Sequence, residues 1–170
     1  FKGVSLIQFA SFRNTFKEEL KKKIVAFDTF DDFPETQFQA DKKLREQFIS
    51  EAGSKSIDIT ELEKIFNKKK INNFSLIKGN ILETLPNFID DNKDIKISLL
   101  HIDVDVYEPT KLILEMLFSK VVKGGVIIFD DYNVFPGETK AVNEFFKKND
   151  NLEIKQLSFS KKRPSFIIKK

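Results

Sequence analysis

Cysteine is absent from the 170 residues of the sequence. Without it, the chain can form neither a disulfide framework nor a metal site built on thiolates. The sequence also has no run of about 20 apolar residues, the length that a membrane-spanning helix requires. Its opening stretch, FKGVSLIQFASF, lacks the basic, apolar and cleavage regions of a signal peptide. These absences favour a cytoplasmic protein that has no membrane partner.

A strong charge of one sign is missing too. The sequence has 29 basic and 26 acidic residues, which gives a formal net charge of +3. The lysines are spread over several segments, such as KEELKKK, FNKKK and FFKKN, and do not gather on one element. This distribution indicates a solvated surface, and we expect no nucleic-acid partner. A chain of this length can bury its own core, so we expect one domain over residues 1–170.

The sequence lacks an initiating methionine. It starts with Phe1, its one methionine is Met116, and its first residues already resemble the inside of a secondary-structure element. We therefore expect that a further segment precedes residue 1 and that the domain is incomplete at its N-terminus.

Short apolar segments alternate with longer amphipathic ones along the chain, which predicts an α/β fold with a mostly parallel sheet. Strands are expected over residues 22–30, 73–80, 95–105 and 125–132. Helices are expected over residues 4–16, 41–53, 60–70, 108–125 and 138–149. The chain is expected to end in an antiparallel hairpin around the sequence SKK, formed by residues 152–159 and 163–170.

Three local signals add detail to this pattern. Thr60 and Glu63 have the spacing of a capping box at the start of a helix. Gly124 and Gly125 are expected to end the helix that precedes them. The segment 95–105 is almost continuously apolar, which predicts a strand that is buried on both faces.

Polar residues stand where the expected strands end. Four of them occupy such positions: Asp28, Asn80, Asp103 and Asp130. Ligands of open parallel sheets collect at these carboxyl ends. Asp105 would share one side of a continuing strand with Asp103, and two carboxylates about 4 Å apart repel by about 4 kcal/mol even at an effective dielectric constant near 20. A divalent cation would remove this repulsion.

The donor set favours a hard cation. The expected donors are carboxylate oxygens, and the chain has one histidine and no cysteine. Such a set suits Mg²⁺, Ca²⁺ or Mn²⁺ better than zinc. A carboxylate that is not needed as a ligand could act as a base. Aspartates also end strands because they cap helices or start turns, so this simpler interpretation stays open for each single aspartate.

The segments LLHIDVDVY and IIFDDY permit a second magnesium chemistry. Phosphatases of the haloacid-dehalogenase type carry a nucleophilic aspartate in a DxDx(T/V) motif and a later DD pair, which would make Asp103 the nucleophile. The match is incomplete, because Tyr107 occupies the fifth motif position and the motif lies past the middle of the chain. This phosphatase is one alternative, and a truncated domain without catalytic activity is another.

Five segments follow one another in the order of a known enzyme family: FKGVSLIQFASF, KKIVAFDTFDDFPE, LIKGNILETLP, LLHIDVDVYEPTK and GGVIIFDDYNVFPGETKAVNEFF. Together they resemble the macrocin O-methyltransferase (TylF-like) family over essentially the whole chain. The resemblance implies a Rossmann-like class I methyltransferase sheet, mostly parallel, whose first strand is missing here. It also implies dependence on S-adenosylmethionine and Mg²⁺, and a small-molecule acceptor such as a sugar or glycoside. Whether the protein forms a homo-oligomer is left open.

The resemblance assigns roles to the aspartates of the second half of the chain. The metal ligands would be Asp103, Asp130 and Asp131, and the general base would be Asp105. This assignment is chemically coherent, because a sugar hydroxyl is a poor nucleophile until it is deprotonated. Mg²⁺ lowers the pKa of a hydroxyl and fixes its position, and a carboxylate accepts the proton.

By the same resemblance, the cofactor would be bound by residues of the first half: Gly3, Ser5, Asp28 and Asn80. Asp28 would bind the ribose hydroxyls, and Asn80 would approach the adenine. Gly3 and Ser5 would lie beside the methionine moiety, at the N-terminus of the first helix. A turn or helix cap at Asp28 and an ordinary turn at Asn80 are the simpler alternatives.

Other residues have two interpretations. Tyr107, Tyr132 and Asn133 either line the acceptor pocket or only pack. His101 is expected to be a core histidine whose polar atoms are satisfied. Residues 34–57 either cover the acceptor or form a plain crossover helix.

Overall fold

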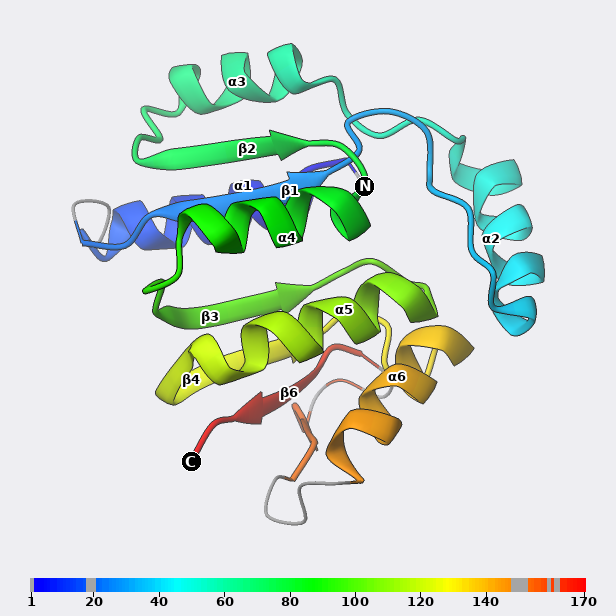
Figure 1. Ribbon diagram of the computed structural model, residues 1–170. Helices are drawn as coiled ribbons and strands as arrows, with labels where there is room; N and C mark the ends of the chain where they lie inside the picture. Colours follow the sequence, from blue (N-terminus) through cyan, green and yellow to red (C-terminus); the bar gives the residue numbers. More distant parts are fainter. Residues whose placement is uncertain (1, 18–20, 148–152, 159, 161–162) are drawn as a thin grey trace. The chain divides into compact units, whose positions relative to one another are not determined.

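The computed structural model describes residues 2–17, 21–147, 153–158, 160 and 163–170. The chain divides into two compact units. The first consists of Phe1–Pro34 and Ile49–Thr84, and the second of Glu35–Phe48 and Leu85–Lys170. Figure 1 labels helices α1 to α6 and strands β1 to β4 and β6.

The first unit contains a pair of parallel strands. Strand β1 (Ile24–Asp28) pairs with β2 (Phe74–Lys78) along its whole length. The core of the unit is a cluster made of Ala10, Phe30, Leu62, Phe66 and Ile71. Leu62 and Phe66 come from helix α3 (Ile59–Lys68), and their spacing of four places them on one helical face. Ala10 comes from helix α1 (Val4–Thr15), so both helices contribute to this core.

Helix α3 is capped by a residue other than the expected one. Its N-cap is Asp58, whose Oδ1 accepts hydrogen bonds from the backbone N–H groups of Thr60 at 2.8 Å and Glu61 at 3.3 Å. The expectation of a capping box from Thr60 to Glu63 is therefore wrong. The helix begins before Thr60, because the Asp58 carboxylate already satisfies two of the N–H groups that a helix leaves without partners at its start.

The second unit contains a four-stranded sheet of order β3-β4-β6-β5. Its strands are β3 (Ile97–Ile102), β4 (Val121–Phe129), β5 (Lys155–Gln156) and β6 (Ser165–Ile168). β3 and β4 are parallel, whereas β6 is antiparallel to both β4 and β5. The C-terminal antiparallel hairpin is thus confirmed, and the second and third residues of its SKK turn lie outside the described residues.

Two helices of this unit, α5 (Tyr107–Leu117) and α6 (Pro136–Phe146), pack against each other. Their apolar residues Leu114 and Val142 are completely buried, as are Ile127 and Phe129 of β4. Completely burying side chains of this size stabilises a fold by roughly 1.5–3 kcal/mol each. This core fixes the start of each helix relative to the strand that precedes it.

The expected helix over residues 108–125 is too long. Helix α5 ends at Leu117, and after the short 3₁₀ helix η1 (Phe118–Lys120) the chain enters β4. Gly124 and Gly125 lie inside that strand, where Gly124 has φ 77° and donates a hydrogen bond to the Lys169 carbonyl at 2.7 Å. A Cβ on Gly125 would lie 2.7 Å from Val121 Cγ1. The glycine pair therefore lies at an irregularity within a strand and does not end a helix.

β3 differs from its expectation in two ways. It ends at Ile102, so Asp103 and Asp105 lie in the loop beyond the strand. Leu99 is 42% exposed, so the expected burial of both faces is wrong. Among the described strands β3 pairs only with β4, and an apolar run on an edge strand need not be covered on both sides.

Two further helices, α2 (Gln39–Ala52) and α4 (Ile81–Asp91), include residues of both units. α2 agrees with the expected helix over 41–53. α4 was not expected, because Pro86 in its middle interrupts the helical pattern. Its start is capped by Asn80, whose Oδ1 accepts a hydrogen bond from the Leu82 N–H at 3.0 Å.

The α/β class is confirmed, with parallel pairs β1–β2 and β3–β4 and an antiparallel C-terminal hairpin. No described strand pairs with both sheets, which agrees with the expectation that the first strand of a Rossmann-like sheet is missing. Within the described ranges, no helix combines the length and apolar character needed to cross a bilayer.

Candidate active site

An acidic cluster lies where β3 and β4 end. The two strands are parallel and pair Ile102 with Phe129, their last residues. The Asp130 N–H extends this pairing by donating to the Ile102 carbonyl at 3.0 Å. Asp103 and Asp130 therefore follow directly at the same edge of the sheet, as expected from the sequence.

The structure brings four aspartates and one histidine together. Ligand atoms of His101, Asp103 and Asp130 lie within 4.8 Å of one another. Those of Asp103, Asp105 and Asp131 form a second such group. Asp103 belongs to both groups, so its carboxylate could bind a cation held by either group.

The donor set is compatible with Mg²⁺. Octahedral coordination at about 2.1 Å places opposite ligand oxygens about 4.2 Å apart, and the ligand atoms of each group lie within 4.8 Å of one another. A second feature is Glu138, whose Oε2 is buried and has no hydrogen-bond partner within the described residues. An unpartnered buried carboxylate oxygen next to a carboxylate cluster is an arrangement that a cation would stabilise.

Asp103 is the most accessible member of the cluster. Its residue is exposed, unlike Asp105 and Asp131. Partial desolvation, followed by repulsion from Asp130, raises the pKa of the Asp103 carboxyl above its usual value.

Asp105 has a constrained backbone. Its φ is 61°, in the left-handed region, which is uncommon for residues other than glycine and which aspartate adopts more often than most. Its carbonyl accepts a hydrogen bond from the Glu138 N–H at 3.3 Å. Burial, and then a hydrogen bond with Asp131 and the negative charges around it, raise the pKa of Asp105 well above its usual value. The left-handed turn reverses the chain between β3 and α5 and turns the Asp105 side chain toward Asp131.

Glu138 is a member of the site that the sequence analysis did not identify. It lies in the first turn of α6, is completely buried, and its Oε1 accepts a hydrogen bond from the Asp131 N–H at 3.0 Å. Burial and the Asp131 charge raise its pKa to about 9. The signal in the sequence was an acidic residue at a helix start, seven residues after the DD pair.

Arg163 and His101 contact the aspartates of the cluster. Arg163 Nη1 donates to Asp131 Oδ1 at 2.5 Å. His101 Nε2 lies 3.4 Å from Asp130 Oδ1, and this hydrogen bond lowers the pKa of Asp130. The expectation that the polar atoms of His101 are satisfied therefore agrees with the structure, although its partner is a carboxylate of the site. Arg163 was not identified from the sequence.

The residues expected to bind the cofactor lie in the first unit. Asp28 is the last residue of β1 and Asn80 follows β2 at the same edge of the two-stranded sheet, where the Gly79 N–H donates to the Asp28 carbonyl at 3.0 Å. Asp28 Oδ1 also accepts a hydrogen bond from the Phe30 N–H at 2.7 Å. Both side chains therefore stabilise turns, as the simpler interpretations predicted, and cofactor binding by them stays a prediction.

The start of α1 holds the other two expected cofactor residues. Gly3 is the N-cap of α1 and has φ 72°. A Cβ at this position would lie 3.2 Å from Leu62 Cδ1, so glycine is favoured by conformation and by space. Ser5 lies in the first turn of the helix, whose N–H groups are available to an anionic group.

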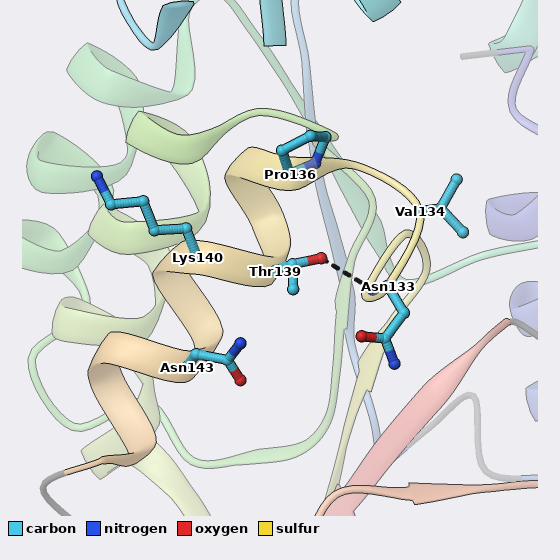
Figure 2. A pocket seen from close by; sticks show the side chains of 6 residues that line it. All are labelled: Asn133, Val134, Pro136, Thr139, Lys140 and Asn143. Carbon is cyan, nitrogen blue, oxygen red and sulfur yellow. Dashed lines mark hydrogen bonds between the residues drawn. The ribbon is translucent and has the colours of Figure 1, made fainter. Parts of the chain in front are cut away.

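A shallow pocket of about 510 Å³ lies along α6 and the loop before it. It is lined by Asn133, Val134, Pro136, Thr139, Lys140 and Asn143, as Figure 2 shows. The Asn133 N–H donates to Thr139 Oγ1 at 2.9 Å, which holds the loop against the helix (Figure 2). Asn133 therefore lines a pocket.

Tyr132 and Tyr107 do not line this pocket. The Tyr132 hydroxyl donates to Asn143 Oδ1 at 2.9 Å, and the Tyr107 hydroxyl donates to Glu144 Oε2 at 2.7 Å. The Tyr107 hydroxyl thereby joins the start of α5 to α6, and the Tyr132 hydroxyl joins the loop after β4 to α6.

A profile of the macrocin O-methyltransferase (TylF) family matches residues 2–157. Two structures of CalS11 are similar. One is the apo form, described as a TDP-rhamnose 3′-O-methyltransferase of calicheamicin biosynthesis, with 26% identity and a TM-score of 0.63. The other has 27% identity and a TM-score of 0.66. No curated protein sequence matches the chain.

The O-methyltransferase NovP is also similar, with a TM-score of 0.76 at 22% identity. The matches cover 93–94% of this chain, whereas the chain spans only 64–65% of the length of CalS11 and NovP. The fold is that of a Rossmann-like class I methyltransferase. The profile match over almost the whole chain defines the relationship more narrowly. The protein belongs to the macrocin O-methyltransferase family.

Proposed function

We propose that the protein transfers a methyl group from S-adenosylmethionine to a hydroxyl of a sugar or similar small molecule. In this proposal Asp103, Asp130 and Asp131 bind Mg²⁺, and Asp105 is the general base. The observation that carries it is the gathering of these aspartates at the carboxyl ends of β3 and β4, in a chain that belongs to the macrocin O-methyltransferase family. The family also favours methyl transfer over the phosphatase alternative.

The chemistry divides between the bound groups and the protein. When bound, the sulfonium of S-adenosylmethionine supplies the methyl group, and Mg²⁺ supplies the positive charge that makes an acceptor hydroxyl more acidic. Asp105 accepts the hydroxyl proton, because methyl transfer needs a nucleophilic oxygen. Its backbone is fixed by the left-handed turn and by the hydrogen bond from Glu138, which would keep the base aligned with the acceptor.

Cofactor binding belongs to the first unit in this proposal. Asp28 and Asn80 share one edge of the β1–β2 sheet, and Gly3 with Ser5 forms the start of α1. Asp28 would bind the ribose hydroxyls through the carboxylate oxygen that is not used by Phe30, and Asn80 would approach the adenine. The helix start would face the charged methionine moiety.

The proposed acceptor class is supported by the pocket along α6 and by the relatives. Asn133 and Asn143 offer side-chain amides, and Lys140 offers an ammonium group, which suits a ligand rich in hydroxyl groups. CalS11 is described as acting on TDP-rhamnose. We therefore propose a sugar or glycoside as the acceptor of this protein.

Thermal denaturation of the full-length protein tests the proposal. Mg²⁺ and S-adenosylhomocysteine, each at 100 times its dissociation constant, should each stabilise the fold by about 2.7 kcal/mol. Transfer of a labelled methyl group to a panel of nucleotide sugars and glycosides then identifies the acceptor. A domain without catalytic activity would show no thermal shift, and a phosphatase would release phosphate without S-adenosylmethionine.

A further inference from the structure

Asp41 is a buried carboxylate outside the acidic cluster. It lies in the first turn of α2 and is completely inaccessible to solvent. Its Oδ2 accepts a hydrogen bond from the Tyr107 N–H at 3.0 Å, and its Oδ1 accepts one from the Gly137 N–H at 2.7 Å. Tyr107 is the first residue of α5, and Gly137 is the second residue of α6. One carboxylate therefore joins the starts of the two helices that follow the acidic loops.

The charge of Asp41 suits this position. A helix start presents backbone N–H groups without partners and the positive end of the helix dipole. Here two helix starts share one carboxylate, so the carboxylate satisfies one N–H from each. The fit is close, since a Cβ on Gly137 would lie 1.9 Å from Asp41 Oδ2. Glycine at 137 is therefore needed for the contact, and a larger residue would displace the carboxylate.

The segment around Asp41 is fastened to α5 and α6 by further contacts. The Thr36 hydroxyl donates to Glu108 Oε2 at 2.9 Å. The rings of Phe38 and Tyr107 have centroids 5.4 Å apart, and Lys140 Nζ lies 4.6 Å from each centroid. These contacts attach the segment before Asp41 to both α5 and α6.

The two helix starts held by Asp41 are close in sequence to the proposed base and to a proposed metal ligand. Asp105 lies two residues before Tyr107, and Asp131 lies six residues before Gly137. We infer that Asp41 is a positioning residue, which fixes the distance between the Asp105 loop and the Asp131 loop and thereby the geometry of the cation site. This inference rests on the proposed function, because it gives Asp41 a role only if the cluster binds a cation.

The test replaces Asp41 with asparagine in the full-length protein. Asparagine has the same shape, but its amide nitrogen cannot accept a hydrogen bond, so one of the two N–H groups loses its partner. Two readouts are independent of activity. Hydrogen exchange of residues 103–108 and 131–138 reports on the loops, and Mn²⁺ binding followed by electron paramagnetic resonance reports on the site. We expect faster exchange in both segments and Mn²⁺ affinity lowered about 10- to 100-fold.

Asp91→Asn is the matched control, because Asp91 is an exposed aspartate at the end of α4. It should change neither readout. The inference is overturned if Asp41→Asn leaves either the exchange or the Mn²⁺ affinity at the level of this control. If the wild-type protein binds no Mn²⁺, the proposed function fails, and unchanged exchange in Asp41→Asn would then also reject Asp41 as the link between the loops.

A second variant covers the case in which Asp41→Asn does not fold. Glu108→Gln weakens the attachment of Thr36 and leaves Asp41 in place. We expect both readouts to change in the same direction as for Asp41→Asn, but by a smaller factor. Exchange and Mn²⁺ affinity identical to those of Asp91→Asn would overturn the inference.

Discussion

Arg163 Nη1 lies 2.5 Å from Asp131 Oδ1, so a guanidinium already neutralises one carboxylate of the acidic cluster. The Asp131 side chain is 3% exposed, whereas that of Arg163 is 55% exposed. The pair therefore joins a fixed, buried carboxylate to a cation that can move into solvent. Because Mg²⁺ would use the same carboxylate, the arginine and the metal compete for it.

Replacement of Arg163 by alanine should therefore strengthen Mg²⁺ binding. A partly exposed ion pair contributes at most about 1 kcal/mol, which corresponds to a gain in affinity of about two- to fivefold. Isothermal titration calorimetry of the full-length protein measures the Mg²⁺ affinity. Lys96→Ala removes an exposed cation just before β3, at the end of the strand away from the cluster, and should leave the affinity unchanged. Weaker binding by Arg163→Ala would mean that the arginine holds Asp131 in place for the metal.

Asp105→Asn should remove turnover and keep cofactor binding. The asparagine cannot accept the proton, and loss of a general base lowers the rate by about 10²- to 10⁴-fold. The fold should survive, because asparagine tolerates the left-handed conformation that Asp105 adopts at φ 61°. Methyl transfer and titration with S-adenosylhomocysteine separate the two effects. Retained turnover would reject Asp105 as the base.

The positions of Asp103 and Asp130 could be predicted because they depend on local pattern. Apolar runs of strand length, separated by helical segments, indicate parallel strands, and the residues that follow such runs lie at one edge of the sheet. Neither position needs knowledge of distant contacts. The edge of the sheet where the acidic residues gather was therefore readable from the sequence.

Other members of the site depend on contacts between distant residues. Arg163 reaches Asp131 from 32 positions away, and Asp41 reaches Gly137 from 96 positions away. No local signal marks such partners, since their meeting is decided by the packing of α2, α6 and β6. The error at Gly124 has a different cause, because a glycine with positive φ can end a helix or form an irregularity in a strand.

Gly137→Ala should destabilise the protein by about 1–3 kcal/mol, because the added methyl group overpacks the contact with Asp41. It should also weaken Mn²⁺ binding, since the displaced carboxylate no longer holds the Gly137 N–H. Urea denaturation and Mn²⁺ titration measure the two effects. Gly53→Ala is the comparison, because it strains a backbone at φ 85° and its Cβ meets nothing within 4 Å. It should lower stability and leave Mn²⁺ binding unchanged; the same result for Gly137→Ala would contradict the prediction.

Glu138 links the pH to the stability of the metal-free protein. Its pKa is 4.5 in the unfolded chain and about 9 in the fold. Below pH 4.5 the carboxyl is neutral in both states. As the pH rises from 4.5 to 9, the unfolded chain releases the proton and the fold retains it, so the fold loses stability by up to about 1.4 kcal/mol per pH unit from this group.

Glu138→Gln should remove this pH dependence. Glutamine does not titrate, its Oε1 can still accept from the Asp131 N–H, and its amide group is a donor where the protonated carboxyl carries its hydrogen. In urea denaturation with a chelator present, the free energy of unfolding of the variant should therefore rise relative to that of the wild type by a few kcal/mol between pH 5 and pH 8. Glu83→Gln, at an exposed glutamate, should show a constant difference over the same range. A constant difference for Glu138→Gln as well would mean that the buried carboxyl is ionised in the fold, and that a cation or Arg163 balances its charge there.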